Sequence, residues 1–144
     1  MADVHEPAVR SYNMSRVKSK NTKPEIQVRK HLHAAGFRYT LRGKNKGEKL
    51  PGKPDIILPA YKSVVFVHGC FWHAHDDCKF FKIPETRRDF WKKKLLGNRE
   101  RDIKNEQDLK KRGWKVFVIW TCQLKTNALA TETLLELENE LSNQ

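Results

Sequence analysis

The feature that most constrains this chain is a strand-like apolar run that ends in a dense group of reactive side chains. Residues 64–67 read Val-Val-Phe-Val, the β-branched and aromatic pattern of a buried strand. Residues 68–78 then hold two cysteines, three histidines and two aspartates around the pair Phe71-Trp72. A rigid strand that presents such groups at its end is a common way to build a functional site.

The charge of the chain favours an anionic partner. Its 144 residues predict one main domain, and Lys plus Arg (29) exceed Asp plus Glu (17) by twelve. This excess is typical of nucleic-acid binding, although a basic surface that only aids solubility is the simpler alternative. Residues 1–20 are basic without apolar periodicity, so we expect them to form a DNA-contacting arm, with residues 21–144 forming a single domain.

The cysteine count and the apolar runs predict a soluble, cytoplasmic protein. Three cysteines make a disulfide framework improbable and favour a reducing, intracellular compartment. The N-terminus lacks an apolar signal region, and the longest apolar runs are far shorter than a membrane span. We therefore expect no membrane association.

The order of the expected elements predicts an α/β fold with a mixed central sheet flanked by helices. Thr22-Lys23-Pro24-Glu25 is a capping box that starts a helix, and Gly36 ends it. Short strands are expected at 37–41, 55–58 and 64–68, the last two as a hairpin, and a further strand at 114–120. Helices are expected at 85–112, with Gly97-Asn98 as a candidate interruption, and at the C-terminus. The predicted inner faces are Ile26, Leu32 and Ala35 in the first helix and Leu134, Leu137 and Leu141 in the last.

A structural zinc site is the first chemical hypothesis. Cys70, His75 and Cys78 supply three ligands of the type that zinc prefers, and Cys122 follows another predicted strand. A site of three cysteines and one histidine would use every cysteine in the chain. The alternative is three unrelated buried thiols with surface histidines.

An acid and two histidines form the second hypothesis. In the predicted hairpin, Asp55 starts one strand and His68 ends its neighbour, so the two side chains should approach each other. With His73, they are a candidate site for Mg²⁺ binding and proton transfer. The alternatives are that Asp55 is a turn residue and that each histidine makes an ordinary polar contact. The capping box by itself explains Glu25.

The aromatic pair Phe71-Trp72 is the third candidate. It lies in a polar loop, where it could enter between base pairs or form a small local core over the metal ligands.

Together these motifs closely resemble the very short patch repair (Vsr) DNA mismatch endonucleases. The resemblance rests on Pro51-Gly52-Lys53-Pro54-Asp55, His68-Gly69-Cys70-Phe71-Trp72-His73, Phe90-Trp91 and Val118-Ile119-Trp120-Thr121-Cys122. It also includes Asn13-Met14 and Asn21-Thr22-Lys23-Pro24-Glu25, and spans roughly residues 3–125.

The resemblance implies a fold similar to type II restriction endonucleases and an Mg²⁺-dependent nick 5′ of the thymine in a T:G mispair. Such mispairs arise when 5-methylcytosine deaminates. Asp55 would bind Mg²⁺ and His73 would be the general base. His68 would support the phosphate or the attacking water, and Glu25 would assist.

The resemblance also assigns structural and DNA-contacting roles. Cys70, His75, Cys78 and Cys122 would hold the structural zinc. Phe71 and Trp72 would wedge beside the mispair, with Met14 entering from the opposite groove. The family suggests a monomer on DNA, and other repair proteins are possible partners.

The chain departs from related nucleases at three points. Phe66-Val67-His68 stands where the wider nuclease fold usually carries a second acid and a lysine. Val67 replaces a threonine of some members, which leaves its main-chain carbonyl as the Mg²⁺ ligand. The gap between His75 and Cys78 is one residue longer than in some members. A zinc-stabilised DNA-binding module without catalysis is the alternative function.

Overall fold

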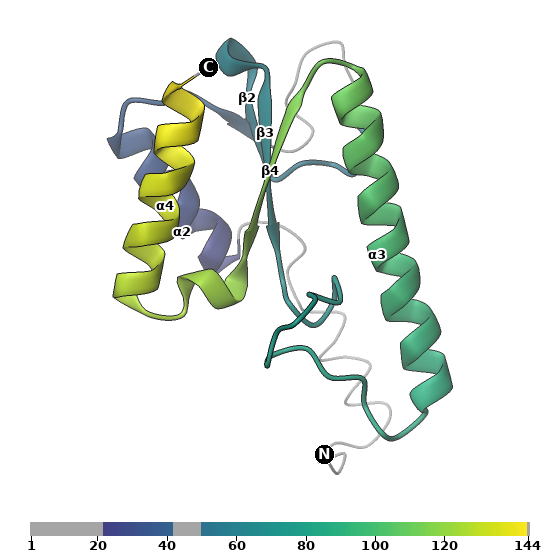
Figure 1. The fold of residues 1–144 in the computed structure, drawn as a ribbon. Coiled ribbons are helices and arrows are strands. Elements are labelled where there is room, and N and C mark those ends of the chain that lie inside the picture. The colour runs from purple at the N-terminus through teal and green to yellow at the C-terminus, as the bar shows by residue number, and fades with distance from the viewer. Residues whose placement is uncertain (1–21, 42–49, 144) are drawn as a thin grey trace.

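A four-stranded mixed sheet organises the protein, as the computed structural model in Figure 1 shows for residues 22–41 and 50–143. The strands are β1 (Thr40–Leu41), β2 (Ile56–Leu58), β3 (Ser63–His68) and β4 (Lys115–Trp120), in that order across the sheet. The pairs β1–β2 and β2–β3 are antiparallel, whereas β3 and β4 are parallel. The expected arm at residues 1–20, with Met14, lies outside the described residues.

Helices cover both faces of this sheet (Figure 1). Helices α2 (Lys23–Ala34) and α4 (Asn127–Ser142) lie on one face, and α3 (Arg88–Lys111), which connects the parallel strands, lies on the other. Two 3₁₀ turns, η1 (Pro59–Tyr61) and η2 (Thr121–Leu124), follow β2 and β4. The predicted mixed α/β architecture is confirmed for the described residues.

Each face of the sheet has its own hydrophobic core. Alternate residues of the hairpin point to opposite faces, so Ile56 and Val65 pack with α2 and α4 while Ile57 and Val64 pack on the α3 side. Because both faces are buried, β3 reads as an unbroken apolar run, the feature from which its prediction came.

The strand register places the two candidate clusters beyond the C-terminal ends of β3 and β4. Ile56 pairs with Val65 in the predicted hairpin, which is confirmed. In the parallel pair, His68 lies opposite Trp120, so the segments that follow β3 and β4 leave the sheet together. This register brings the loop that begins at Gly69 close to η2, which carries Cys122.

The helix predictions hold at the ends more often than along the faces. Thr22 caps α2 by accepting a hydrogen bond from the Glu25 backbone N–H at 3.4 Å, as predicted. Ala35, however, is exposed, and Val28 occupies the core with Leu32. Of the predicted face, Leu32 is confirmed and Ile26 is half-buried, whereas Ala35 was wrong because the apolar pattern of α2 is weak and its packing partners set its rotation.

The two remaining helices differ in how their sequences encode them. Helix α3 runs without a break through Gly97, so the predicted interruption was wrong; one interior glycine costs a helix only about 1 kcal/mol. Leu134, Leu137 and Leu141 of α4 are buried, as predicted. None of the described helices combines the length and apolarity that crossing a membrane requires.

Candidate active site and metal centre

The hairpin delivers Asp55 to the end of β3, where its carboxylate is buried. Asp55 immediately precedes β2, and its Oδ2 accepts a hydrogen bond from the Val67 backbone N–H at 2.7 Å. The carboxylate lies in a cavity of about 460 Å³. Other residues that line this cavity are Glu25, Lys53, Val67, His68, Trp72 and His73. The structure therefore brings together the predicted acid, both predicted histidines and Glu25.

Gly52 explains the turn that precedes Asp55. Its φ of +79° lies in the left-handed region, and a Cβ atom there would be 3.0 Å from the Asn105 Cβ and 3.2 Å from the Phe66 ring. Only glycine fits both the backbone conformation and the close approach to α3. The Pro-Gly-Lys-Pro-Asp motif is thus a tight turn that fixes Asp55 at the mouth of β2.

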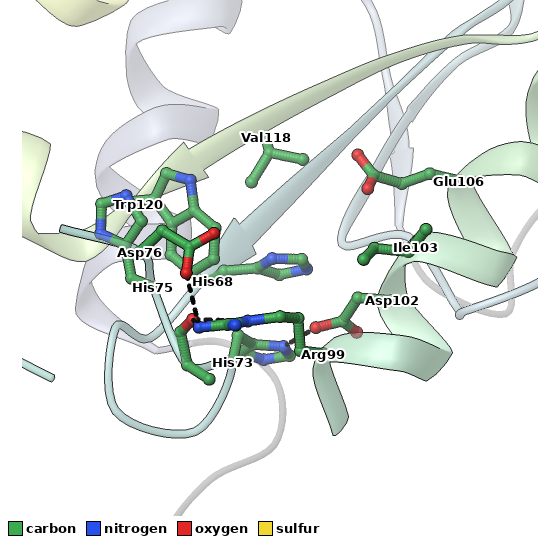
Figure 2. Close-up of a pocket in the computed structure, with 11 residues that line it drawn as sticks. His68, His73, His75, Asp76, Arg99, Asp102, Ile103, Glu106, Val118 and Trp120 are labelled. Carbon is green, nitrogen blue, oxygen red and sulfur yellow. Dashed lines mark hydrogen bonds and ion pairs between the residues drawn. The ribbon is translucent and has the colours of Figure 1, made fainter. Parts of the chain in front are cut away.

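His68 and His73 form a parallel stack at the side of this cavity. Their ring centroids are 3.9 Å apart and the ring planes differ by 4°. His73 Nδ1 lies 2.6 Å from Asp102 Oδ2, an interaction that Figure 2 marks between the loop and α3. A carboxylate at Nδ1 favours the tautomer with hydrogen on that nitrogen, which leaves Nε2 able to accept a proton.

Asp102 is the residue of this group that sequence reasoning missed. It lies in a charge-rich helix whose regular ion-pair spacing is typical of a solvated face, and no motif marks it. The one local signal is Glu106 four residues later, a like charge where a pair of opposite charges would be expected.

Burial keeps His68 neutral. Its ring is 5% exposed, and burial, with the neighbouring His73, lowers its pKa from 6.5 to about 4, although the Asp102 charge opposes the shift. His68 therefore carries no charge near pH 7 and can offer one N–H donor only.

The three cysteines and His75 converge beyond the C-terminal ends of β3 and β4. One ligand atom from each of Cys70, His75, Cys78 and Cys122 lies within 4.8 Å of the others, and Cys122 Sγ is 3.5 Å from His75 Nδ1. A tetrahedral zinc site with such ligands requires ligand atoms about 3.5 Å apart. The donor types are those that zinc prefers, and this cluster can hold a metal ion.

The pKa values of Cys70 and Cys122 are shifted in opposite directions. Burial raises the pKa of Cys70, but hydrogen bonds from Thr121, Cys122 and Cys78 lower it by more in sum. The pKa of Cys122 is raised to about 12 by burial and by its contacts with Cys70 and Cys78. Only a bound cation would therefore favour the thiolate form of Cys122 near pH 7.

Helix α3 holds the loop that connects the two clusters. Asn98 Nδ2 donates to the Trp72 carbonyl at 3.0 Å, and Arg99 Nε donates to the Ala74 carbonyl at 3.0 Å. Arg99 also forms an ion pair with Asp76 at 2.8 Å. Arg99, Ala74 and Asp76 border a second cavity of about 370 Å³ between β4 and α3, shown in Figure 2.

Phe71 and Trp72 belong to a half-buried aromatic group. Phe71 and Trp72 meet edge to face at 5.1 Å, and both contact Trp91 of α3, at 5.7 and 6.0 Å. Trp72 also lines the Asp55 cavity.

A buried acid and paired histidines in a basic chain suit an enzyme that acts on nucleic acid. Comparison with known proteins assigns the family: residues 2–79 match the model of DNA mismatch endonuclease Vsr. The chain belongs to this family, and it is a DNA endonuclease of the mismatch-repair type, as the sequence motifs predicted.

Three relatives share most of their length with this chain. Type II nicking enzyme V.NmeAIP of Neisseria meningitidis is 46% identical, and the alignment covers 99% of each chain. Type II nicking enzyme V.XorIIP of Xanthomonas oryzae is 46% identical over 86% of this chain and 88% of its own. DNA mismatch endonuclease Vsr of Escherichia coli is 38% identical over 94% of this chain and 83% of its own.

Proposed function

We propose that this endonuclease nicks duplex DNA 5′ of the thymine in a T:G mispair by Mg²⁺-dependent hydrolysis. The observation that carries the proposal is a single cavity lined by Asp55, His73 and Asp102, with Asp102 paired to Nδ1 of His73. A carboxylate for a metal and a base for water thus face the same space.

The residues present suit Mg²⁺. This ion usually takes one or two carboxylates and keeps several waters, so Asp55 with the adjacent Val67 carbonyl is a sufficient protein share. Glu25 lines the same cavity and can bind a coordinated water. When bound, Mg²⁺ would neutralise charge that develops on the phosphate.

His73 is the general base of this proposal. Its Nε2 takes a proton from the attacking water while the new P–O bond forms and the bond to the leaving 3′ oxygen breaks. Asp102 stabilises the resulting imidazolium through Nδ1. Neutral His68 donates one hydrogen bond to the phosphate or to the water.

The cysteine cluster serves as the structural zinc site. Cys70, His75, Cys78 and Cys122 provide four ligands and leave no position for substrate, as in closed structural sites. Bound zinc would join the loop after β3 to the turn after β4, which supports the position of His73.

Phe71 and Trp72 act as the wedge beside the mispair, with Trp91 supporting them from α3. Inserting rings between base pairs costs a few kcal/mol per unstacked step, and a mispair lowers that cost. Met14 would enter from the opposite groove.

The remaining predictions follow from this activity. The mixed sheet with Asp55 at a strand start supports the expected likeness to type II restriction endonucleases. We further propose that the protein acts as a monomer on DNA and that other repair proteins dock on it. A DNA-contacting arm would precede a single domain, and the location would be cytoplasmic, where genomic DNA is accessible.

A strand-specific nicking assay tests the function. Duplexes that differ only in T:G or C:G at one position are incubated with Mg²⁺, and the set varies the flanking bases. We expect cleavage 5′ of the mispaired T that is lost with EDTA and in Asp55→Ala, while Asp55→Ala still binds DNA.

Two other outcomes would replace the proposal. Equal cutting of both duplexes would leave a nuclease without mismatch preference, and Phe71→Ala with Trp72→Ala would then leave substrate choice unchanged. Tight binding without cutting in every context would indicate the zinc-stabilised DNA-binding module.

A further inference from the structure

We propose that Arg99 is the positioning residue that sets the orientation of His73 and His75 together, by fixing the peptide between them against α3. The inference rests on the proposed role of His73 as the base. It concerns a residue outside both clusters, which reaches them through the backbone alone.

Ala74 is the point at which the loop can pivot. It separates His73, which faces the Asp55 cavity, from His75, which faces the cysteines, and it is 1% exposed. Its φ of +49° is left-handed, a conformation that is unfavourable for a residue with a Cβ. A strained residue at such a junction persists only if its surroundings hold it.

The backbone N–H groups around Ala74 bond within the loop, whereas the Ala74 carbonyl bonds to a residue of α3. The backbone N–H groups of His73, Ala74 and His75 donate to Gly69, Phe71 and Cys70 within the loop, at 3.1, 3.2 and 3.0 Å. The Ala74 carbonyl instead accepts from Arg99, through both Nε at 3.0 Å and Nη2. Two donors from one planar guanidinium fix the rotation of this peptide as well as its position.

Asp76 orients the guanidinium but carries little of the effect. The Arg99–Asp76 pair is 2.8 Å long, yet the Asp76 side chain is 78% exposed, and exposed ion pairs contribute little. Figure 2 shows Arg99 extending from α3 toward Asp76, past the His73–Asp102 pair. Removing Asp76 should therefore spare the bonds to Ala74.

Loss of Arg99 should slow nicking more than it weakens DNA binding. Asn98 still holds the Trp72 carbonyl and Asp102 still holds His73, so the loop before Ala74 stays attached to α3 while the peptide at Ala74 gains freedom to rotate. A misplacement of about 1 Å in a catalytic group can cost up to about a hundredfold in rate.

The experiment compares Arg99→Ala with two controls, Asp76→Ala and Lys104→Ala, the latter an exposed position on the same helix. Single-turnover nicking is measured at saturating T:G duplex on protein with one zinc per chain. We expect about a tenfold slower rate for Arg99→Ala at unchanged DNA affinity, since only orientation is altered. Both controls should stay within about twofold of wild type, as surface changes usually do.

Two further readouts separate positioning from general stability. In the Asp102→Asn background, Arg99→Ala should slow nicking by a smaller factor than in wild type, because both residues act on His73. Hydrogen exchange should rise in residues 69–78 of Arg99→Ala and nowhere else. Equal factors in the two backgrounds, or wild-type rate and exchange, overturn the proposal.

Arg99→Lys covers the case in which Arg99→Ala does not fold. It keeps the charge but cannot donate two fixed bonds to one carbonyl, so we expect an intermediate rate; a wild-type rate and exchange pattern contradicts the proposal. If wild type itself does not nick, the proposed function fails, and hydrogen exchange still tests whether Arg99 fixes the loop.

Discussion

Two clusters share one stretch of chain and differ in the element that completes each. The histidine–carboxylate group takes His68 and His73 from the stretch, and the cysteine group takes Cys70, His75 and Cys78. Along the chain the residues of the two groups are interleaved, in the order His68, Cys70, His73, His75 and Cys78. Asp102 from α3 completes the first, and Cys122, after β4, completes the second.

The comparison teaches that residues distant in the sequence, Asp102 and Cys122, decide the chemistry of the two groups that share this loop. A group of thiols and one histidine suits a closed zinc site, while a carboxylate at one nitrogen of His73 suits proton transfer. The cysteine group should govern folding, and the histidine–carboxylate group should govern rate. The four predictions below test that division, starting with the largest expected effect.

Removing the metal should unfold the cysteine side of the molecule. Cys78→Ser, or treatment with a strong chelator, deletes a site that can contribute on the order of 10 kcal/mol to folding. Zinc content and urea unfolding measure the effect, with His73→Ala as the variant that should retain one zinc per chain. A Cys78→Ser protein with wild-type stability and zinc content would contradict the structural role.

His73→Ala should reduce the nicking rate without unfolding the protein. A positioned general base contributes typically about 10²–10⁴-fold, so the rate at saturating mismatched duplex should fall by that order. The melting temperature and zinc content should remain near wild type. His33→Ala, at an exposed position of α2, controls for loss of a histidine. Full activity in His73→Ala would remove it from the proposed mechanism.

His68 should make stability depend on pH below neutrality. Because burial lowers the pKa of His68 from 6.5 to about 4, the unfolded chain binds a proton between these values that the folded chain does not. Stability should therefore fall from pH 6.5 to pH 4, by up to about 3 kcal/mol.

The measurement compares urea unfolding of wild type and His68→Asn at pH 7 and pH 5. Both proteins lose stability as zinc ligands gain protons, so the difference between their pH dependences isolates His68. A wild-type loss no steeper than that of His68→Asn would show that His68 does not have the lowered pKa.

Asp102→Asn should give the smallest of these effects. The amide keeps the size of the side chain but removes the charge beside His73 Nδ1, and losing such an outer partner typically costs about 10–100-fold in activity. Nicking at saturating duplex measures it, with Asp108→Asn, elsewhere on α3, as the matched control. A rate equal to that of the control would place Asp102 outside the catalytic group.

Most features carried by short windows of sequence were predictable. The hairpin follows from two β-branched runs around a turn, and the start of α2 from its capping residues. The cysteine cluster was predictable from residue type, since three thiols and a nearby histidine have few other uses together. The geometry then showed that these atoms converge.

The sequence by itself determined the hairpin, the last strand, the start of α2 and the residue types of both clusters, because capping, periodicity and ligand chemistry act over a few neighbouring residues. The strand expected at 37–41 is limited to Thr40–Leu41, and the helix expected from residue 85 begins at Arg88. Only the tertiary structure decided that Asp102 and Arg99 face the loop. Leu95 and Leu109 are the buried residues of α3, too few to fix its rotation from the sequence pattern. Packing across the sheet sets that rotation, and with it the side chains that reach His73 and Ala74.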